Sequence, residues 1–343
     1  MRYQLLGRSG LRVSELALGV MTFGENWGFG EARDECRRVF DTYVQAGGNF
    51  FDTANKYTDG TSERMLGEFI GAERDRFVVA TKYTLSMRDG DPNANGNHRK
   101  NLRQSVEASL QRLATEYIDL LWLHAWDFTT PADEVMRALD DMIRTGKVLH
   151  VGISDAPAWV VAQCNTLAEL RGWTRFVGLQ VEHSLIERTV ERELLPMARS
   201  LGLAIAPWAA LGGGVLTGKY TRGELSDTRR TERNQRRITE RNLHIARMVD
   251  RIADEEGRTS TQVALNWVRA QRGQVVPIIG ARTAQQLVDS LACLEFELND
   301  EQLARLDEAS AIELGFPHDF YSRERIQHIM FGGLAKSIRR ELP

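Results

Sequence analysis

Four residues with acid–base side chains stand where the chain leaves short apolar runs or in the turn just beyond one. Asp52 follows NFF, Lys82 follows VVAT and His124 follows LLWL, while Tyr57 comes five residues after Asp52. A phenol titrates near pH 10, too high for efficient proton donation at pH 7 unless its anion is stabilised. A lysine ammonium would stabilise that anion, and a carboxylate would hold the lysine charged and in place. With a histidine to orient a carbonyl oxygen, the set predicts proton transfer to a developing alkoxide, so a hydride must come from elsewhere.

Each of these residues, taken alone, has a structural alternative. Asp52 could cap the turn that follows it. Lys82 could extend its ammonium to the rim of a fold, and His124 could be a core histidine satisfied by one hydrogen bond. The chemical interpretation therefore depends on whether the fold brings them to one place.

The elements that would position them are short apolar runs separated by helical patterns. Nearly continuous apolar runs are typical of parallel strands that are buried on both faces. The expected strands are residues 15–20, 49–54, 76–82, 117–124, 147–154, 175–181, 202–208 and 275–280. Apolar residues at spacings of three and four predict helices over 32–47, 99–113, 132–147 and 158–172.

Strand ends recur about every 30 residues, which is the size of a βαβ unit. Eight such units predict an α/β fold, a closed (β/α)8 TIM barrel, and a doubly wound sheet is disfavoured because no GxGxxG follows the first strand. Barrel geometry would bring the ends of three successive strands together. Residues 1–15 predict a hairpin on the barrel floor, and the polar stretches 86–97 and 217–241 are expected on the C-terminal face. Without a dividing linker, 1–343 is expected to be one domain with a tail over 314–343.

Composition excludes several classes of function. The 343 residues carry a net charge of −3, which gives no electrostatic footprint for nucleic acid or an anionic membrane. No apolar run is long enough to cross a bilayer, and no apolar leader follows Met1. The three cysteines show no metal-binding spacing, so we expect a reduced, cytoplasmic protein without a metal site.

The sequence resembles a known family, the aldo-keto reductases, over nearly its whole length. The resemblance is carried by FDTANKYTDGTSERMLGE, VVATK and DLLWLHAWD. GISDAPAWVVAQ, LQVEHSLIERTVERELLPMARSLGL and LGGGVLTGKY are similar to the branch of bacterial and fungal reductases that includes potassium-channel β-subunits. The resemblance implies that Tyr57 is the proton donor, that Lys82 and Asp52 tune it, and that His124 orients the substrate carbonyl.

The same resemblance implies that NADP(H) lies extended across the barrel mouth. Ser154, Asp155 and Gln180 would bind the nicotinamide carboxamide, and Trp208 would stack on its ring. Arg282 would pair with a 2′-phosphate, which favours NADPH over NADH. The implied cofactor-binding residues are Thr22, Asp52, Ser154, Asp155, Gln180, Trp208, Leu211, Gly212, Gly214, Lys219, Gly280, Arg282, Gln286 and Ser290. The expected walls of the substrate pocket are Trp27, Tyr83 and Trp126.

Some positions depart from the family pattern. Asp155 stands where asparagine is usual, and a carboxylate can accept from a carboxamide NH2 but cannot donate to its oxygen. His183 replaces a common tyrosine, and Ser290 replaces a usual asparagine near the adenine. Ala209 and Ala210 replace a Ser-Pro pair, which removes a hydroxyl near the pyrophosphate.

These inferences favour an NADPH-dependent reductase acting on a small-molecule aldehyde or ketone. One alternative is a cofactor-binding regulatory subunit with a membrane partner, because the channel β-subunits keep the same four residues. The absence of a long segment before the barrel favours the enzyme. A Schiff-base lysine enzyme is less favoured, since Asp52 would keep Lys82 charged. The physiological substrate and a homo-oligomeric state are left open.

Overall fold

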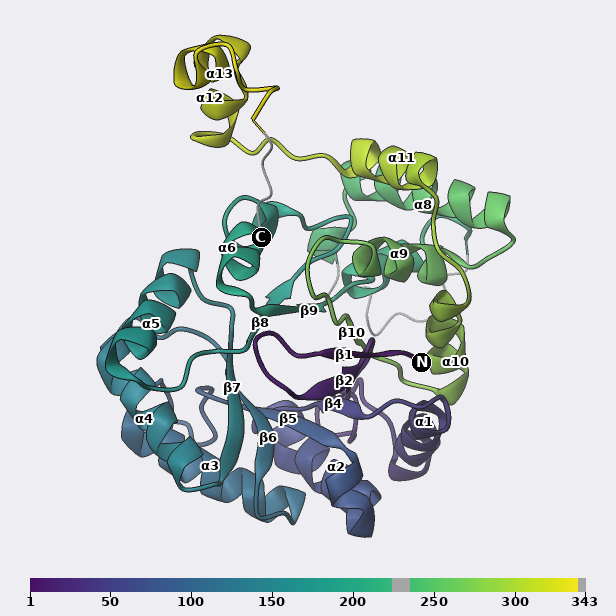
Figure 1. Cartoon of the computed structure of the whole chain (residues 1–343). Helices are drawn as coiled ribbons and strands as arrows, with labels where there is room; N and C mark the ends of the chain where they lie inside the picture. The colour runs from purple at the N-terminus through teal and green to yellow at the C-terminus, as the bar shows by residue number, and fades with distance from the viewer. Residues whose placement is uncertain (224–234, 339–343) are drawn as a thin grey trace.

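A ring of parallel strands surrounded by helices makes up the body of the protein (Figure 1). The computed structural model describes residues 1–223 and 235–338, so 224–234 of the predicted loop 217–241 and 339–343 of the tail lie outside the described residues. The eight strands run in the order β10-β3-β4-β5-β6-β7-β8-β9. They are β3 (Ala17–Gly19), β4 (Phe50–Asp52), β5 (Val78–Tyr83), β6 (Ile118–Leu123), β7 (Val148–Ser154), β8 (Gly178–Glu182), β9 (Ala204–Trp208) and β10 (Ile278–Ile279).

The two ends of this sheet are joined by hydrogen bonds. The Ile205 N–H donates to the Gln274 carbonyl at 2.8 Å, and the Val276 N–H donates to the Ile205 carbonyl at 2.8 Å. This parallel bridge brings the segment before β10 against β9. All eight predicted strands are present in the predicted order, and the (β/α)8 barrel is confirmed.

Helices lie outside the strands and connect them. They are α1 (Arg33–Gln45), α2 (Thr61–Ile70), α3 (Arg99–Leu113), α4 (Ala132–Arg144), α5 (Ala158–Arg171), α6 (Leu194–Leu201), α8 (Glu240–Glu256), α9 (Ser260–Arg269), α10 (Ala284–Leu291) and α11 (Asp300–Ser310). The four predicted helices correspond to α1, α3, α4 and α5. Reciprocal side-chain caps start two others: Thr259 with Gln262 at α9, and Asn299 with Gln302 at α11.

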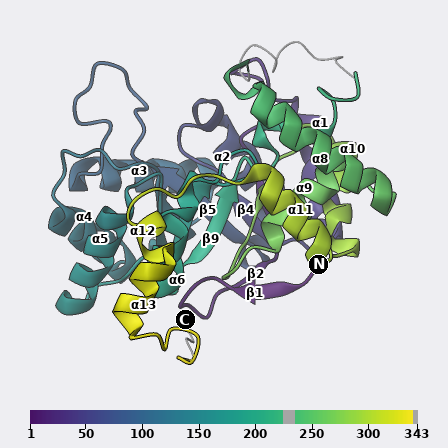
Figure 2. The same ribbon diagram turned by 90° about the horizontal axis from the view of Figure 1, so that it is seen from above.

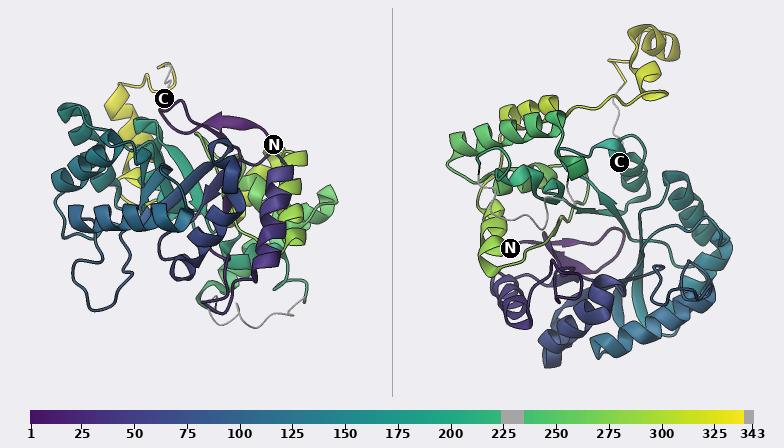
Figure 3. Two further views of the ribbon diagram at one scale, coloured as in Figure 1. Left: turned by 90° about the horizontal axis from the view of Figure 1, so that it is seen from below. Right: turned by 180° about the vertical axis from the view of Figure 1, so that it is seen from behind.

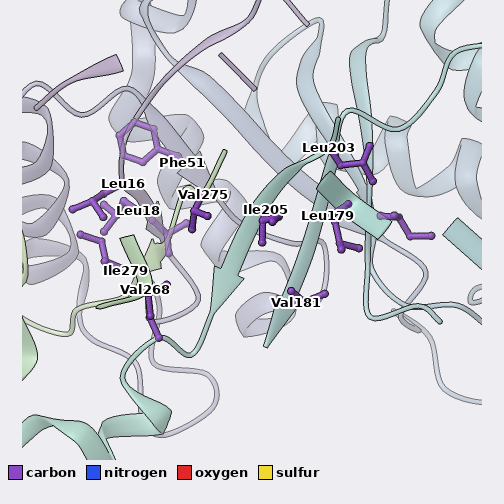
Figure 4. Close-up of a cluster of buried hydrophobic side chains, with 14 of the residues drawn as sticks. Leu16, Leu18, Phe51, Leu179, Val181, Leu203, Ile205, Val268, Val275 and Ile279 are labelled. Atoms are coloured by element: carbon purple, nitrogen blue, oxygen red, sulfur yellow. The ribbon is translucent and has the colours of Figure 1, made fainter. Parts of the chain in front are cut away.

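The strands separate two layers of apolar side chains, because successive residues of a strand point to opposite faces. Phe50 and Ala204 belong to the cluster inside the barrel. Their neighbours Phe51 and Ile205 belong to the larger cluster between the strands and the helices. Figure 4 shows part of this outer cluster around β3, β8, β9 and β10.

One large side chain fills much of the barrel interior. The Trp122 ring of β6 is fully buried and lies against Gly152 of β7 and Gly178 of β8. A Cβ atom at Gly152 would lie 2.3 Å from that ring, and one at Gly178 would lie 2.9 Å from it. Strands β7 and β8 therefore need glycine at these two positions.

The predicted N-terminal hairpin closes the floor of the barrel. Strands β1 (Tyr3–Leu5) and β2 (Arg12–Ser14) pair antiparallel, and Leu6 and Val13 pack into the interior cluster. Gly7 has φ +58°, and a Cβ there would lie 1.9 Å from the Val177 carbonyl oxygen. The floor and its hairpin lie on the opposite side from the long loop before α3 (Figure 2).

The tail after α11 extends away from the barrel. It contains α12 (His318–Ser322) and α13 (Glu324–Phe331), and neither helix has a buried residue. Both stand apart from the ring of helices when the molecule is viewed from behind (Figure 3).

Candidate active site

The predicted chemical residues occupy inward-facing positions at the carboxyl ends of the strands. In β5, Val78 and Ala80 point into the barrel, so Lys82, two residues further on, points the same way. Trp122 of β6 likewise precedes His124 by two residues. The same two-residue step places the whole set on the inner face: Asp52, Lys82, His124, Ser154, Gln180 and Trp208.

Asp52 and Lys82 form a buried ion pair at the centre of this set. The Lys82 ammonium donates to Asp52 Oδ1 and, at 2.8 Å, to the Thr53 carbonyl. Gln180 Nε2 donates to the second carboxylate oxygen of Asp52 at 2.9 Å. Burial by itself lowers the pKa of Lys82, but the interactions with Asp52 and Tyr57 together outweigh burial and raise that pKa above the usual value. Lys82 is therefore a fixed cation at neutral pH.

Tyr57 lies directly against this cation. The Lys82 Nζ atom is 4.7 Å from the centre of the Tyr57 ring. Removal of water around the phenol raises the pKa of Tyr57, and the Lys82 charge lowers it without outweighing burial. The direction of the lysine effect is as predicted, yet Tyr57 holds its proton firmly before any ligand binds. A proton donor must be in this protonated state.

A strained turn holds Tyr57 in place. Thr58 and Gly60 have φ +45° and +86°, and such a φ is uncommon for a threonine. The Thr58 hydroxyl donates to the Phe23 carbonyl at 2.7 Å and accepts from the Ser62 N–H at 2.9 Å. Sequence reasoning missed Thr58 and Ser62 as supports, although a run of small hydroxyl residues around a glycine directly after Tyr57 was a signal.

His124 stands beside the phenol as a neutral imidazole. Its ring centre is 5.9 Å from that of Tyr57, and the two planes meet at 84°. Burial, helped by the Lys82 charge, lowers the pKa of His124 to about 3. Its Nδ1 atom is buried without a hydrogen-bond partner in the described part of the chain. At neutral pH His124 can therefore donate a hydrogen bond but carries no charge.

The three residues predicted to line the substrate pocket lie in different surroundings. Trp27 packs edge-on against Tyr57 at 6.3 Å, and its indole N–H donates to Asp59 Oδ2 at 3.2 Å. Trp126 is partly buried against the outer cluster, with its backbone N–H directed at the Asp155 carbonyl. Tyr83 is not at the site, which corrects the prediction.

The physical reason for the Tyr83 correction is the alternation of the strand. Tyr83 follows the inward-facing Lys82, so its ring points outward into the layer beneath the helices. It is fully buried there, and its hydroxyl donates to the Asn97 carbonyl at 3.3 Å.

The residues predicted to meet the nicotinamide lie close to one another. Ser154 is buried at the end of β7, and Gln180 is engaged with Asp52 through its amide. Asp155 has φ +44°, and its Oδ1 atom accepts a hydrogen bond from the Trp208 indole N–H at 3.2 Å. The structure thus links two predicted cofactor residues to each other.

A glycine-rich turn follows Trp208 and carries some of the residues that the resemblance implies for cofactor binding. After Leu211, the helical turn η4 (Gly212–Thr217) begins with left-handed glycines, among them Gly212 at φ +58° and Gly214 at φ +97°. A Cβ at Gly214 would lie 3.1 Å from the Lys219 ammonium nitrogen. Glycine at this position therefore lets the Lys219 ammonium approach the backbone closely.

Several of the implied cofactor-binding residues lie around the start of α10. The Thr22 hydroxyl donates to the carbonyl of Ala281 at 2.9 Å, directly after Gly280. The Arg282 N–H donates to Gln286 Oε1 at 3.0 Å. Ser290 shares the buried face of α10, so its hydroxyl is turned toward the protein body.

Two carboxylates not foreseen from the sequence also reach this segment. Arg282 Nε lies 3.7 Å from Glu31 Oε1. The Ala284 N–H, at the start of α10, donates to Glu35 Oε1 at 2.8 Å. This hydrogen bond lowers the pKa of Glu35, so both the arginine and the helix start meet negative charge within the protein.

His183, which departs from the family pattern, holds the loop after β8 to the helical layer. Its Nε2 atom lies 3.0 Å from Glu191 Oε1, and Arg188 donates to both carboxylate oxygens of Glu191. Burial alone would raise the pKa of Glu191, but these hydrogen bonds lower it to about 2. Arg188 also lies over the Trp267 ring at 5.2 Å.

Within 1–223 and 235–338, no group of three or more histidine, cysteine or acidic side chains could hold a metal ion. No helix in those ranges has both the length and the apolar character that crossing a bilayer requires.

Comparison with known proteins agrees with this geometry. The sequence profile described as Aldo/keto reductase family matches residues 15–311. The chain is 42% identical to a norsolorinic acid reductase of Emericella nidulans, over 91% of this chain and 82% of that protein. It is 35% identical to an aryl-alcohol dehydrogenase of Pestalotiopsis microspora, over 98% and 87%. It is 37% identical to an aldo-keto reductase of Aspergillus calidoustus, over 93% and 84%.

Proposed function

Because the chain belongs to the aldo-keto reductase family, we propose that it is an NADPH-dependent enzyme that reduces aldehyde or ketone carbonyls to alcohols. The observation that carries the proposal is the buried Asp52–Lys82 ion pair directly beneath the ring of Tyr57. A buried ion pair of this kind contributes little to stability on average, so its place beside a phenol favours a chemical role.

Tyr57 is the proton donor in this proposal. NADPH, when bound, supplies the hydride that adds to the carbonyl carbon. As negative charge grows on the carbonyl oxygen, the Tyr57 hydroxyl gives its proton to that oxygen and becomes a phenolate. The Lys82 ammonium, held by Asp52, stabilises the phenolate, which partly offsets the effect of burial on the pKa of Tyr57.

His124 orients the carbonyl without competing for the proton. Its pKa of about 3 keeps the imidazole neutral, so it offers one N–H donor and no charge. A hydrogen bond from this N–H to the carbonyl oxygen would direct the oxygen toward Tyr57, whose ring centre lies 5.9 Å from that of His124.

The residues around the mouth fit NADPH. Trp208 offers an aromatic face for the nicotinamide, and Lys219 beside the glycine turn offers a cation for the pyrophosphate. Arg282 would pair with the 2′-phosphate. Glu31 Oε1 lies 3.7 Å from Arg282 Nε, so the Glu31 side chain has to move away from Arg282 when the 2′-phosphate binds.

The substrate that we propose is an aryl carbonyl. The rings of Trp27, Tyr57 and His124 pack edge to face in sequence, which gives an aromatic wall beside the reacting hydroxyl. Two of the relatives are named for norsolorinic acid and for aryl alcohols, which supports the same class.

The decisive experiment follows NADPH consumption with matched aromatic and aliphatic aldehydes. We expect turnover with aromatic aldehydes and a loss of about 10²–10⁴-fold in the Tyr57→Phe variant, which keeps the ring and loses the proton. Tyr321→Phe, an exposed tyrosine of the tail, is the matched control and should be unaffected. Unchanged turnover in Tyr57→Phe rejects the proton donor. NADPH binding without reduction of any carbonyl favours the regulatory alternative.

A substitution at Arg282 tests the proposed preference for NADPH over NADH. Arg282→Ala should weaken binding of NADPH and leave binding of NADH nearly unchanged, because only NADPH carries the 2′-phosphate. Fluorescence titration measures both dissociation constants. Equal weakening of the two would reject the phosphate contact.

A further inference from the structure

The indole of Trp208 is tied to a carboxylate from a strand that is not its neighbour. Trp208 ends β9 and Asp155 directly follows β7, with β8 between them. The Trp208 Nε1–H nevertheless donates to Asp155 Oδ1 at 3.2 Å. This hydrogen bond crosses the mouth of the barrel above β8.

The main chain on both sides of this hydrogen bond is fixed. The Asp155 N–H donates to the Gln180 carbonyl at 3.3 Å, and the Trp208 carbonyl accepts from the His183 N–H at 3.3 Å. Trp208 is also in register with Glu182 in the β8–β9 ladder. The remaining freedom at Trp208 is therefore rotation of its side chain.

Space for such a rotation is present. A cavity of about 380 Å³ is bordered by Asp155, Pro157, Val181, Val190 and Trp208. Trp208 is partly exposed and is not among the residues of either apolar cluster. An indole with open volume beside it is not held by packing, so the hydrogen bond to Asp155 fixes the angle of its ring.

We propose that Asp155 is a positioning residue that acts through Trp208, holding the indole so that its face meets the nicotinamide. The inference rests on the proposed function, because it takes Trp208 as the stacking residue. It differs from the role that the family resemblance implies for this position, which is direct contact with the carboxamide. A carboxylate only accepts hydrogen bonds, and an indole N–H only donates, so the two groups complement each other.

Three substitutions separate the two roles. Asp155→Ala removes the acceptor, Asp155→Asn keeps an acceptor oxygen, and Trp208→Phe keeps an aromatic face without the N–H. We expect Asp155→Ala to weaken NADPH binding about tenfold in the wild-type background, since a hydrogen bond to a charged group contributes that order of free energy. In the Trp208→Phe background the same change should matter less than about twofold. Asp155→Asn should bind nearly as the wild type does.

A measurement without cofactor tests the hydrogen bond itself. In the ¹⁵N spectrum of the free protein, the Trp208 indole N–H is identified by its loss in Trp208→Phe. Asp155→Ala should speed its exchange with solvent about tenfold or more. The Trp267 indole, which donates to Asp307 Oδ1 at 3.0 Å, is the internal control and should not change.

The results of these experiments distinguish a failure of the positioning role from a failure of the proposed function. Unchanged exchange of the Trp208 N–H in Asp155→Ala overturns the proposal. Equal loss of NADPH affinity from Asp155→Ala in both backgrounds also overturns it, because Asp155 then acts on the cofactor directly. Tighter binding by Asp155→Asn points the same way, since asparagine can also donate to the carboxamide oxygen. Failure of the wild type to bind NADPH at all is instead a failure of the proposed function and shows before any variant is made.

Discussion

Replacing Lys82 by methionine should destabilise the protein strongly, because it leaves a buried carboxylate without its cation. The side chains of Lys82 and Asp52 are 0% and 3% exposed, so water cannot take over the role of the ammonium. Methionine is close to lysine in length and shape, so the substitution changes charge much more than packing.

The expected loss in free energy of unfolding depends on the hydrogen bonds that Asp52 retains after Lys82 is replaced. Removing one partner of a buried ion pair costs about 3–5 kcal/mol in free energy of unfolding. Asp52 retains the hydrogen bond from Gln180 at 2.9 Å, so we expect about 3 kcal/mol for Lys82→Met, at the low end of that range. Asp52→Asn should cost a similar amount, because the ammonium then keeps only the Thr53 carbonyl as a full partner at 2.8 Å.

The double variant should be more stable than either single one. Lys82→Met with Asp52→Asn removes both charges, and replacing a whole buried pair by neutral groups is often close to neutral. We expect a total loss of about 1 kcal/mol, well below the sum of the single losses. All three variants should remain folded, since proteins are typically stable by about 5–15 kcal/mol.

Equilibrium unfolding in urea, followed by circular dichroism near pH 7 without cofactor, measures these free energies. Lys147→Met is the matched control, because Lys147 pairs with Glu107 at the surface and its loss should cost less than about 1 kcal/mol. If Lys82→Met is no more costly than Lys147→Met, or if the single losses simply add, the reasoning about the buried pair is wrong.

Three further predictions concern pH, cofactor affinity and packing. The pKa of His124 is about 3 in the folded protein and near 6.5 in the unfolded chain, so the unfolded chain takes up a proton first as pH falls, and the free energy of unfolding decreases below about pH 6.5. Between about pH 7 and 5, urea titrations should show that the wild type loses about 2 kcal/mol more of this free energy than His124→Gln does. Equal losses would refute the low pKa. Glu31→Gln should tighten NADPH binding about two- to fivefold without affecting NADH, because it removes a carboxylate 3.7 Å from Arg282; a fluorescence titration showing no change would place the phosphate elsewhere. Gly152→Ala should cost about 1–3 kcal/mol in unfolding titrations, because its Cβ would lie 2.3 Å from the Trp122 ring, and a neutral result would mean that the ring can move aside.

Much of the fold was predictable because its signals are local. Nearly continuous apolar runs at regular spacing predicted all eight strands, and helical periodicity predicted α1, α3, α4 and α5. The positions of Asp52, Lys82 and His124 at strand ends were equally visible. Their common direction follows from a two-residue step along each strand, which also belongs to the local sequence.

The prediction that Tyr83 lines the pocket was wrong, because its ring lies in the layer beneath the helices. Tyr83 directly follows Lys82, so the two side chains must point to opposite faces. Because Lys82 faces inward, the alternation along the strand turns the Tyr83 ring outward, beneath the helices.

The sequence by itself determined which residues end the strands and which face they occupy, because alternation is imposed by the backbone of each strand. It could not determine that Glu35 reaches the start of α10, 249 residues away, or that Asp155 holds the Trp208 indole across an intervening strand. Nor could it determine that burial would outweigh Lys82 in the pKa of Tyr57. These properties depend on distances between parts of the chain that only the closed barrel brings together, and the cost of burying a charge is a sum over all of those surroundings.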